Sequence, residues 1–291
     1  MSRYINPYTD FGFKKLFGEE ANKDLLIDFL NALLPDKHQV KVLSFNNPEQ
    51  LGDAVSDRRA VFDVYCEAKS GEKFIVEMQK AEQEYFKDRS VYYVAHPIRS
   101  QEQKGKWNYE LKTVYLIAIL DFIYDKDDPN PILIREVSLK DQHGKEFYEK
   151  LQMIYIQMPV FDMNESELKD SKDKWLYFLK NLPSLEHIPA ILKEKVFKKA
   201  FHTAEIASMS ENDRVSYEHN LDDYRTYLAT IETAENKGIR KGIILGRAEG
   251  RAEGETQKAI DIARNMKKDG VDSAIIAKYT GLSPEEICRL D

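Results

Sequence analysis

The chain has 291 residues, an apolar fraction of 42%, a formal net charge of −7 and a pI of about 5.6. The apolar fraction is enough for a folded core. The acidic balance disfavours a protein that binds nucleic acid over most of its surface, although it allows a local basic patch. The two cysteines, Cys66 and Cys288, are too few for a disulfide framework or a cysteine metal knuckle.

No stretch of the sequence predicts a secretory or membrane segment. The first residues lack the apolar core of a signal peptide. The longest apolar run, residues 114–120, is too short to span a bilayer. We therefore expect a cytoplasmic protein with no membrane partner.

Two helices are predicted at the start of the chain. Residues 7–17 contain a helix that Thr9 or Asp10 can cap. Residues 22–34 place apolar side chains at the 3.6-residue period of a second helix, which Pro35 ends.

A short strand at 40–45 is followed by a predicted β-hairpin over residues 58–80, with its turn at residues 70–71. Side chains alternate between the two faces of a strand. On the first strand of the hairpin, this alternation predicts that Phe62 and Val64 share one face.

The other face of the hairpin carries Asp63, Glu77 and Gln79, each among apolar neighbours. Carboxylates in a half-buried sheet are costly unless a cation or a donor compensates them. Two acids and an amide on adjacent strands suit a divalent metal with oxygen ligands. The alternative is that these side chains lie on the wet face of a half-exposed antiparallel sheet.

The middle of the chain predicts a helix over residues 82–103, shortened or kinked by Pro97. Its expected contact positions are Tyr85, Val91, Tyr92 and Val94. Further along we expect strands at 112–122, 133–139 and 153–158, and helices from 166 to about 231. This order predicts an α/β fold, in which a mixed central sheet is flanked by helices and followed by a helical C-terminal extension.

Glycines recur at every fourth residue from Gly238 to Gly254 within charged sequence. Since four residues make slightly more than one helical turn, these glycines would drift slowly around a helix. Glycine weakens a helix by about 1 kcal/mol relative to alanine, which favours a charged, weakly stable spacer. The alternative is a close contact between copies, which would make a homo-oligomer through the C-terminal helical segment.

Residues 257–291 predict a helix that Gly270 ends, and then two helices joined by a turn at Gly281. Ser283 can cap the last helix, with Pro284 at its first position. The pattern is typical of a helix-turn-helix that binds DNA or of an ordinary helical hairpin. The last helix is short and acidic, which disfavours contact with phosphate.

Other catalytic patterns are absent from the sequence. The histidines form no close pair at metal-ligand spacing. There is no Gly-x-Ser-x-Gly elbow and no phosphate-binding glycine loop followed by Lys-Ser/Thr. The two acids and the amide of the hairpin are therefore the main candidates for chemistry.

Three segments of the chain resemble the Rpn family, the PD-(D/E)xK nuclease-family transposases of bacteria. They are residues 8–17, Tyr-Thr-Asp-Phe-Gly-Phe-Lys-Lys-Leu-Phe; residues 58–67, which include Asp63; and residues 74–80, Phe-Ile-Val-Glu-Met-Gln-Lys. The resemblance covers residues 4–125 and extends more loosely over the helical remainder. It implies a restriction-endonuclease-like core and a DNA endonuclease activity that depends on Mg²⁺ or Mn²⁺ and is associated with recombination or transposition.

The resemblance also implies roles for single residues. Asp63 and Glu77 would be the catalytic acids and metal ligands, with the backbone carbonyl of Met78 as a further ligand and Asp10 as an additional acid. Gln79 stands where many superfamily members have lysine. Because an amide carries no positive charge and is not a base, Gln79 would position the attacking water or a phosphate oxygen. The alternative is a catalytically weak nuclease-fold protein that binds DNA or acts in assembly.

Basic residues near these segments are candidates to hold the DNA backbone. They are Lys14, Lys15, Arg58, Arg59 and Lys80. For each of them, the alternative is a solvated surface charge.

The patterns and the resemblance together predict four parts of the chain. They are a PD-(D/E)xK nuclease-like domain at 1–160, a helical extension at 161–235, a glycine- and charge-rich helical spacer at 236–256, and a small helix-turn-helix-like segment at 257–291.

Overall fold

The structure is a computed structural model that describes residues 2–47, 49–50, 60–103, 105, 107–125 and 127–290. The chain divides into two compact units, residues 1–224 and residues 225–291. Throughout the described residues, no helix has both the length and the apolar character that crossing a membrane requires.

Six of the described strands build the first unit: β1 (Leu43–Phe45), β4 (Val64–Ala68), β5 (Lys73–Gln79), β6 (Val114–Leu120), β7 (Ile134–Lys140) and β8 (Glu146–Gln157). They form one sheet in the order β1-β4-β5-β6-β8-β7. The pairs β5–β6 and β6–β8 are parallel, and the other neighbours are antiparallel. A separate short ladder pairs β2 (Glu49–Gln50) with β3 (Ala60–Val61). The predicted mixed central sheet is confirmed.

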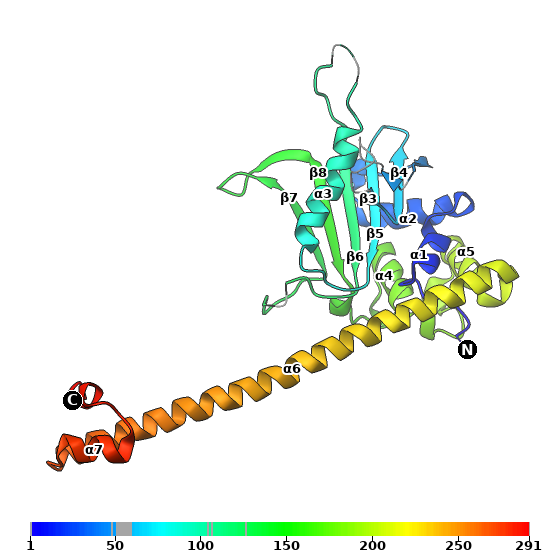
Figure 1. Cartoon of the computed structure of the whole chain (residues 1–291). Helices are drawn as coiled ribbons and strands as arrows, with labels where there is room; N and C mark the ends of the chain where they lie inside the picture. Colours follow the sequence, from blue (N-terminus) through cyan, green and yellow to red (C-terminus); the bar gives the residue numbers. More distant parts are fainter. Residues whose placement is uncertain are drawn as a thin grey trace. The chain divides into compact units, whose positions relative to one another are not determined.

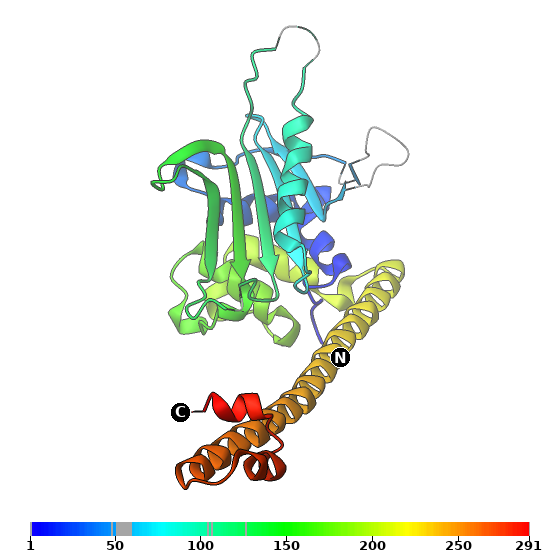
Figure 2. The same cartoon turned by 60° about the vertical axis from the view of Figure 1, so that its left-hand side comes forward.

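Helices cover both faces of the six-stranded sheet (Figures 1 and 2). The helices of the first unit are α1 (Asp10–Phe17), α2 (Lys23–Leu33), α3 (Phe86–Arg99), α4 (Ser171–Asn181), α5 (Lys195–Ala204) and the start of α6 (Glu211–Lys268). α3 packs on one face, and α1, α2, α4 and α5 share the hydrophobic core of the other face. Because both faces are covered, every residue of β6 is buried, as its unbroken apolar sequence predicts.

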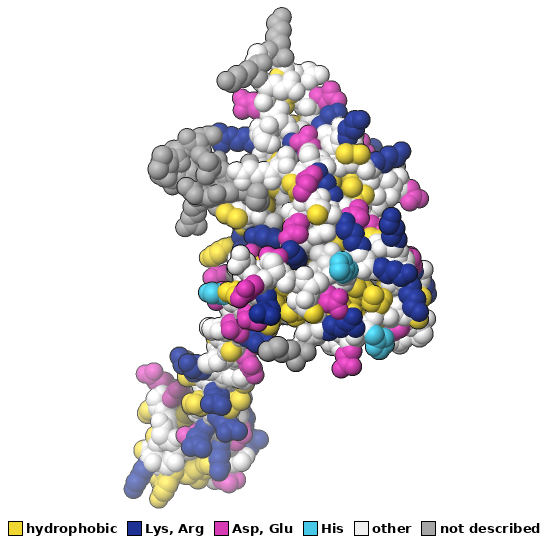
Figure 3. Space-filling view, turned by 90° about the vertical axis from the view of Figure 1, so that its right-hand side faces the viewer, with side chains coloured by type: hydrophobic (Ala, Val, Ile, Leu, Met, Phe, Trp, Pro, Cys, Tyr) yellow, Lys and Arg dark blue, Asp and Glu magenta, His cyan; other side chains and the backbone are white. Residues whose placement is uncertain are grey.

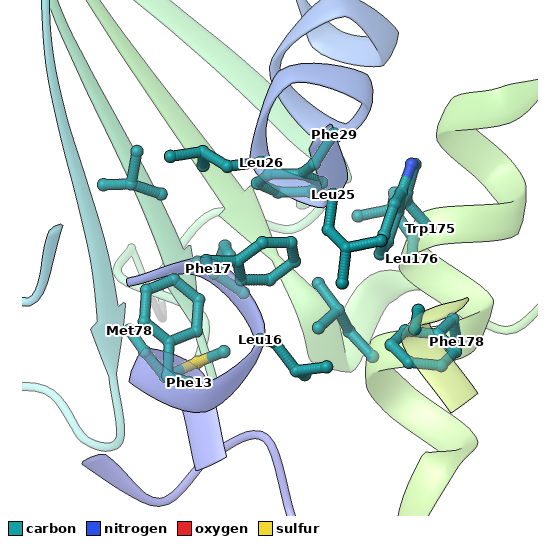
Figure 4. Packing of buried hydrophobic residues seen from close by; sticks show 14 of the residues in the cluster. Phe13, Leu16, Phe17, Leu25, Leu26, Phe29, Met78, Trp175, Leu176 and Phe178 are labelled. Carbon is teal, nitrogen blue, oxygen red and sulfur yellow. The ribbon is translucent and has the colours of Figure 1, made fainter. Parts of the chain in front are cut away.

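The larger core joins the N-terminal helices to α4 and reaches β5 (Figure 4). Phe17 stacks on Phe29 with ring centroids 5.0 Å apart, and Trp175 meets Phe29 edge-on at 5.8 Å. Phe13 lies beside Met78 of β5 in the same core. Burial of these large side chains is the main force that packs the helices onto the sheet, and it fixes α1 next to the end of β5.

The start of α1 is shaped by its cap and by a close backbone contact. Oγ1 of Thr9 accepts a hydrogen bond from the N–H of Gly12 at 3.0 Å. An added Cβ at Gly12 would lie 2.2 Å from the carbonyl oxygen of Asn6, so only glycine fits there. Thr9 is therefore the cap, and Asp10 takes the first helical position.

The predicted hairpin forms with an interruption in its first strand. β4 and β5 pair antiparallel, with Val64 opposite Val76, but residues 62–63 belong to no strand. Phe62 does not share the face of Val64 and instead packs with Tyr65 in the core under α3. The prediction for Phe62 is wrong because a period of two holds only along an uninterrupted strand.

α3 forms inside the predicted range 82–103, with Pro97 in its last turn, but its buried face differs from the prediction. The buried positions are Phe86, Ser90, Val94 and Pro97. The predicted contact positions that are exposed are Tyr85, Val91 and Tyr92. Ser90 interrupts the apolar row at a spacing of four residues, so a search for hydrophobic periodicity does not find this face.

β8 is longer than predicted and begins at Glu146 instead of near Met153. β7 pairs antiparallel along β8, and the first half of β8 meets only the end of β7, at Leu139 and Lys140. Side chains in that half are exposed or partly exposed, so the apolar pattern that marks the second half does not extend to them. The helices predicted from residue 166 onward are confirmed, with Trp175 fully buried in α4.

The second unit contains the remainder of α6, together with α7 (Ser273–Thr280) and α8 (Pro284–Cys288). Gly270 follows the end of α6 and Gly281 caps α7, both with left-handed φ values of +79° and +73°. Ser283 caps α8 in a capping box. The small core of this unit consists of Ala263, Ile276 and Ile287. The predicted helix ends and turn are confirmed.

Candidate active site

Two acidic side chains come together where β4 begins and β5 ends. Glu77 lies on β5 with 4% of its surface exposed, and Asp63 directly precedes β4. Since β4 is antiparallel to β5, the start of β4 meets the end of β5. The same edge is the carboxyl end of the parallel pair β5–β6, where α/β sheets usually bind their ligands.

Hydrogen bonds to the main chain hold the two carboxylates next to each other. The N–H of Asp63 donates to Oε1 of Glu77 at 3.2 Å, and the N–H of Met78 donates to Oδ2 of Asp63 at 2.7 Å. The interruption at residues 62–63 allows this, because the β4–β5 ladder stops at Val64 and the Asp63 carboxylate takes the place of a strand partner. Each acid is thus held by the backbone of the segment that carries the other.

The backbone carbonyl of Met78 is directed toward the same acids. Lys73 and Gln79 form backbone hydrogen bonds on the β6 side of β5. The N–H and C=O of one strand residue point the same way, and successive residues alternate. The carbonyl of Met78 therefore points away from β6 and toward the side on which its N–H meets Asp63.

Burial and mutual repulsion make two negative charges unfavourable at this position. Burial raises the pKa of Glu77 well above its usual value near 4.5, and the charge of Asp63 raises it further. Burial also raises the pKa of Asp63, while the hydrogen bond from Met78 lowers it. A cation bound between the carboxylates would favour the ionised form of both groups.

The oxygens of this edge fit a hard divalent cation such as Mg²⁺ or Mn²⁺, which prefers carboxylate and carbonyl ligands and retains waters. Among the described residues, no group of three or more His, Cys, Asp or Glu side chains is arranged to hold a metal ion. The protein ligands would therefore be the two carboxylates of Asp63 and Glu77 and the carbonyl of Met78, with the remaining positions taken by water or phosphate.

Gln79 lies in a chain of hydrogen bonds between Glu77 and α3. Its Nε2 donates to Oε2 of Glu77 at 2.9 Å, and its Oε1 accepts a hydrogen bond from the guanidinium of Arg89. Because an ionised carboxylate only accepts and a guanidinium only donates, these partners fix the orientation of the amide. The Arg89 guanidinium also donates to Gln83 and lies 5.4 Å from the ring centre of Tyr93.

Arg89 was not among the residues that the sequence pattern indicated. It lies on α3, one helix turn before Tyr93, and its guanidinium donates to Gln79 at the end of β5. The ring of Tyr93 meets that of Phe62, the neighbour of Asp63, edge-on with centroids 5.1 Å apart. Burial raises the pKa of Tyr93, and the charge of Glu77 raises it further. An Arg-x-x-x-Tyr pair on the helix after the acidic strand is the signal that could have indicated Arg89.

Two of the predicted DNA-binding lysines lie close to the acids. After burial, the charges that act on the pKa of Asp63 are those of Asp10, which raises it, and of Lys14 and Lys80, which lower it. Nζ of Lys14 forms an ion pair with Asp10 at 2.8 Å on the surface of α1. Nζ of Lys80 lies 5.7 Å from the ring centre of Tyr224. Asp10, Lys14 and Lys80 therefore surround the acids without a direct hydrogen bond to them among the described residues.

The other predicted DNA-binding residues are placed differently. Nζ of Lys15 forms ion pairs with Glu19 at 2.9 Å and with Asp213 at the start of α6 at 3.0 Å. Arg58 and Arg59 lie outside the described residues. On the face of the first unit seen in Figure 3, basic and acidic side chains are interspersed, so any attraction for phosphate there is local.

Two models of known families match the chain. The family model described as PD-(D/E)XK nuclease family transposase matches residues 7–234, and the model described as Rpn/YhgA-like nuclease family, C-terminal HTH domain, matches residues 256–290. No curated protein and no solved structure matched the chain. The two matched domains imply DNA as the partner and support a function associated with a nuclease and with transposition. The chain belongs to the PD-(D/E)XK nuclease family transposases and carries the C-terminal HTH domain of the Rpn/YhgA-like nucleases.

Proposed function

We propose that the chain is a DNA endonuclease that hydrolyses phosphodiester bonds with Mg²⁺ or Mn²⁺ and acts in recombination or transposition. The observation that supports this most is the hydrogen-bonded pair of Asp63 and Glu77 at the carboxyl end of β5. Buried like charges are unfavourable unless a cation compensates them. Such a pair is therefore expected where a metal ion and a phosphate bind.

The roles of the residues follow from their positions. Asp63, Glu77 and the carbonyl of Met78 would hold the cation, with Asp10 as an additional acid at the rim. When bound, a divalent cation polarises the phosphate and activates water as a nucleophile. Gln79 would orient the attacking water or a phosphate oxygen, because its amide is held from both sides.

The DNA backbone would contact the basic residues around the acids. Lys14 and Lys80 lie near the acids, since their charges act on Asp63. Lys15, Arg58 and Arg59 complete the proposed set. Each phosphate contact of this kind adds affinity without sequence preference.

The remainder of the chain would serve DNA binding and assembly. We keep the division into a nuclease-like domain at 1–160, a helical extension at 161–235, a spacer at 236–256 and a helix-turn-helix segment at 257–291. The last segment would add a second DNA contact, and the C-terminal helical segment would join copies of the chain into a homo-oligomer.

Plasmid cleavage tests the proposal. Wild type incubated with Mg²⁺ or Mn²⁺ should nick or cut supercoiled plasmid, and EDTA should stop the reaction. Asp63→Asn and Glu77→Gln should each lower the rate by about 100-fold or more, because loss of metal-site groups typically has effects of this size. Glu67→Gln is the matched control. Glu67 forms an ion pair with Lys73, with 2.5 Å between Oε2 and Nζ, and takes no part in the contacts of the two acids.

Two outcomes would contradict the proposal. Equal cleavage by Asp63→Asn and wild type would mean that a different site or a contaminant cuts the DNA. Retention of DNA with no product at any metal concentration, unchanged in Glu77→Gln, would favour the alternative of a nuclease-fold DNA-binding or assembly protein. Gln79, which carries no charge, is the residue that favours this second function.

A further inference from the structure

The acid pair has a neutral neighbour where phosphate chemistry calls for a cation. Gln79 lies two residues after Glu77 on β5, and its amide carries no positive charge to offset the negative charge that develops on a phosphate. The inference below rests on the proposed endonuclease function, and it concerns the group that supplies this charge.

Arg89 is the cation that reaches Gln79. Its guanidinium bonds the amide oxygen of Gln79, whose nitrogen bonds Glu77. Among the described residues, Lys14 and Lys80 make no hydrogen bond to Gln79; Lys14 is paired with Asp10. Arg89 thus approaches the acids from the face of the sheet that α3 covers.

The surroundings of Arg89 hold its guanidinium in place. The side chain is half-buried, donates to Gln83 as well as to Gln79, and packs against the ring of Tyr93. Two of its five N–H groups meet these amides, and a planar guanidinium offers its donors in pairs that match two oxygens of a phosphate. The glutamine amides are neutral, so among the described residues no carboxylate forms a hydrogen bond that would cancel the charge of Arg89.

We propose that Arg89 is a catalytic residue of this site, whose guanidinium binds a non-bridging oxygen of the DNA phosphate held beside Asp63 and Glu77. Gln79 and Arg89 act as one unit: the amide fixes the guanidinium, and the guanidinium supplies the positive charge that the amide lacks.

The first test measures DNA binding without turnover. A fluorescein-labelled duplex is titrated with full-length wild type, Arg89→Ala, Arg89→Lys and Lys87→Ala, in EDTA and over a range of salt concentrations. Lys87→Ala is the matched control, because it removes one positive charge from an exposed position of the same helix. Arg89→Ala should weaken binding several-fold more than the control and reduce the slope of log K against log salt by about one.

The second test measures cleavage under single-turnover conditions. Arg89→Ala should lower the rate by about 100-fold, in the range that loss of one charge-stabilising donor produces, and Arg89→Lys should keep part of the activity. Added guanidinium at non-denaturing concentration should restore part of the rate to Arg89→Ala but not to Gln79→Ala, with equal NaCl as the salt control. A merely structural role for Arg89 predicts no such rescue.

The outcomes separate the two proposals. If wild type binds DNA but never cuts it, the endonuclease proposal fails, while a selective binding loss in Arg89→Ala still supports phosphate contact by Arg89. If Arg89→Ala binds and cuts like Lys87→Ala, the role of Arg89 is overturned and the endonuclease proposal stands. If Arg89→Ala is slow, binds normally and is not rescued, Arg89 only positions Gln79 and the phosphate contact is refuted.

Discussion

Asp63 and Glu77 are held together at the expense of folding free energy. Each carboxylate receives a backbone hydrogen bond, but burial opposes both charges, and the charges oppose each other. Functional sites often retain such unfavourable arrangements, because the substrate or the metal ion relieves them.

Removing one charge should therefore stabilise the metal-free protein. Asparagine at position 63 can still accept the N–H of Met78 while it removes the repulsion on Glu77. In EDTA at pH 8, Asp63→Asn should melt above wild type by roughly 2–4 °C, the shift that 1 kcal/mol gives in a domain of this size. Differential scanning calorimetry measures the difference.

The same substitution has a defined pH dependence. The pKa of Asp63 in the folded protein is raised above its ordinary value near 3.8, so the folded state binds this proton more tightly than the unfolded chain. The stability of wild type therefore falls as the pH rises from 3.8, the pKa of Asp63 in the unfolded chain, to its higher pKa in the folded protein. The advantage of Asp63→Asn should be full above this interval and vanish below 3.8. A constant advantage at all pH values would contradict this account, and Glu67→Gln should show no gain.

At the scale of elements, α3 connects the fold to the candidate site. Its buried row packs on the sheet, while Arg89, beside Tyr93, contacts Gln79 at the end of β5. The packing of this helix therefore sets how far the guanidinium reaches toward Gln79.

Two valines of α3 test which face is buried. Val94 is 2% exposed and Val91 is 60% exposed. Val94→Ala should lower the free energy of unfolding by roughly 1–3 kcal/mol, since it removes buried methyl groups and leaves a cavity. Val91→Ala should be neutral or slightly stabilising, because alanine is the better helix former. Urea denaturation of both variants measures this, and equal effects would show that the buried row is misplaced.

At the scale of the whole molecule, the nuclease-family domain and the HTH domain occupy different parts of one chain. The nuclease-family match ends at residue 234 and the HTH match begins at residue 256. The residues between them lie within α6 and include the whole glycine repeat from Gly238 to Gly254. Ile239 and Ile243 lie one turn apart in this segment and are 60% and 49% exposed, which suits contact with a second copy.

The oligomer should depend on this segment. We expect wild type to have a mass in solution that is a multiple of the single-chain mass of 33.9 kDa. The double substitution Ile239→Glu and Ile243→Glu, or deletion of residues 236–291, should reduce the mass in solution to that of one chain. Light scattering measures this mass. Phe147→Glu is the control, because Phe147 is an exposed apolar residue outside the segment. A wild-type mass of one chain would refute the proposed homo-oligomer.

Local chemistry along the chain suffices to predict much of this fold. Caps, turn glycines and apolar runs act on neighbouring residues, so Thr9, Gly281 and the buried strand β6 can be recognised from the sequence. The meeting of Asp63, Glu77 and Gln79 could also be predicted, because a hairpin joins β4, which Asp63 directly precedes, to β5, which carries Glu77 and Gln79.

Contacts between distant segments could not be predicted in this way. The break before β4 moves Phe62 to the other face, α3 brings Arg89 to Gln79, and α6 pairs Asp213 with Lys15. These contacts depend on how whole elements pack, which no local pattern encodes. The acids of the site can therefore be predicted from the sequence. The position of Arg89 beside them is decided only by the packing of α3 onto the sheet.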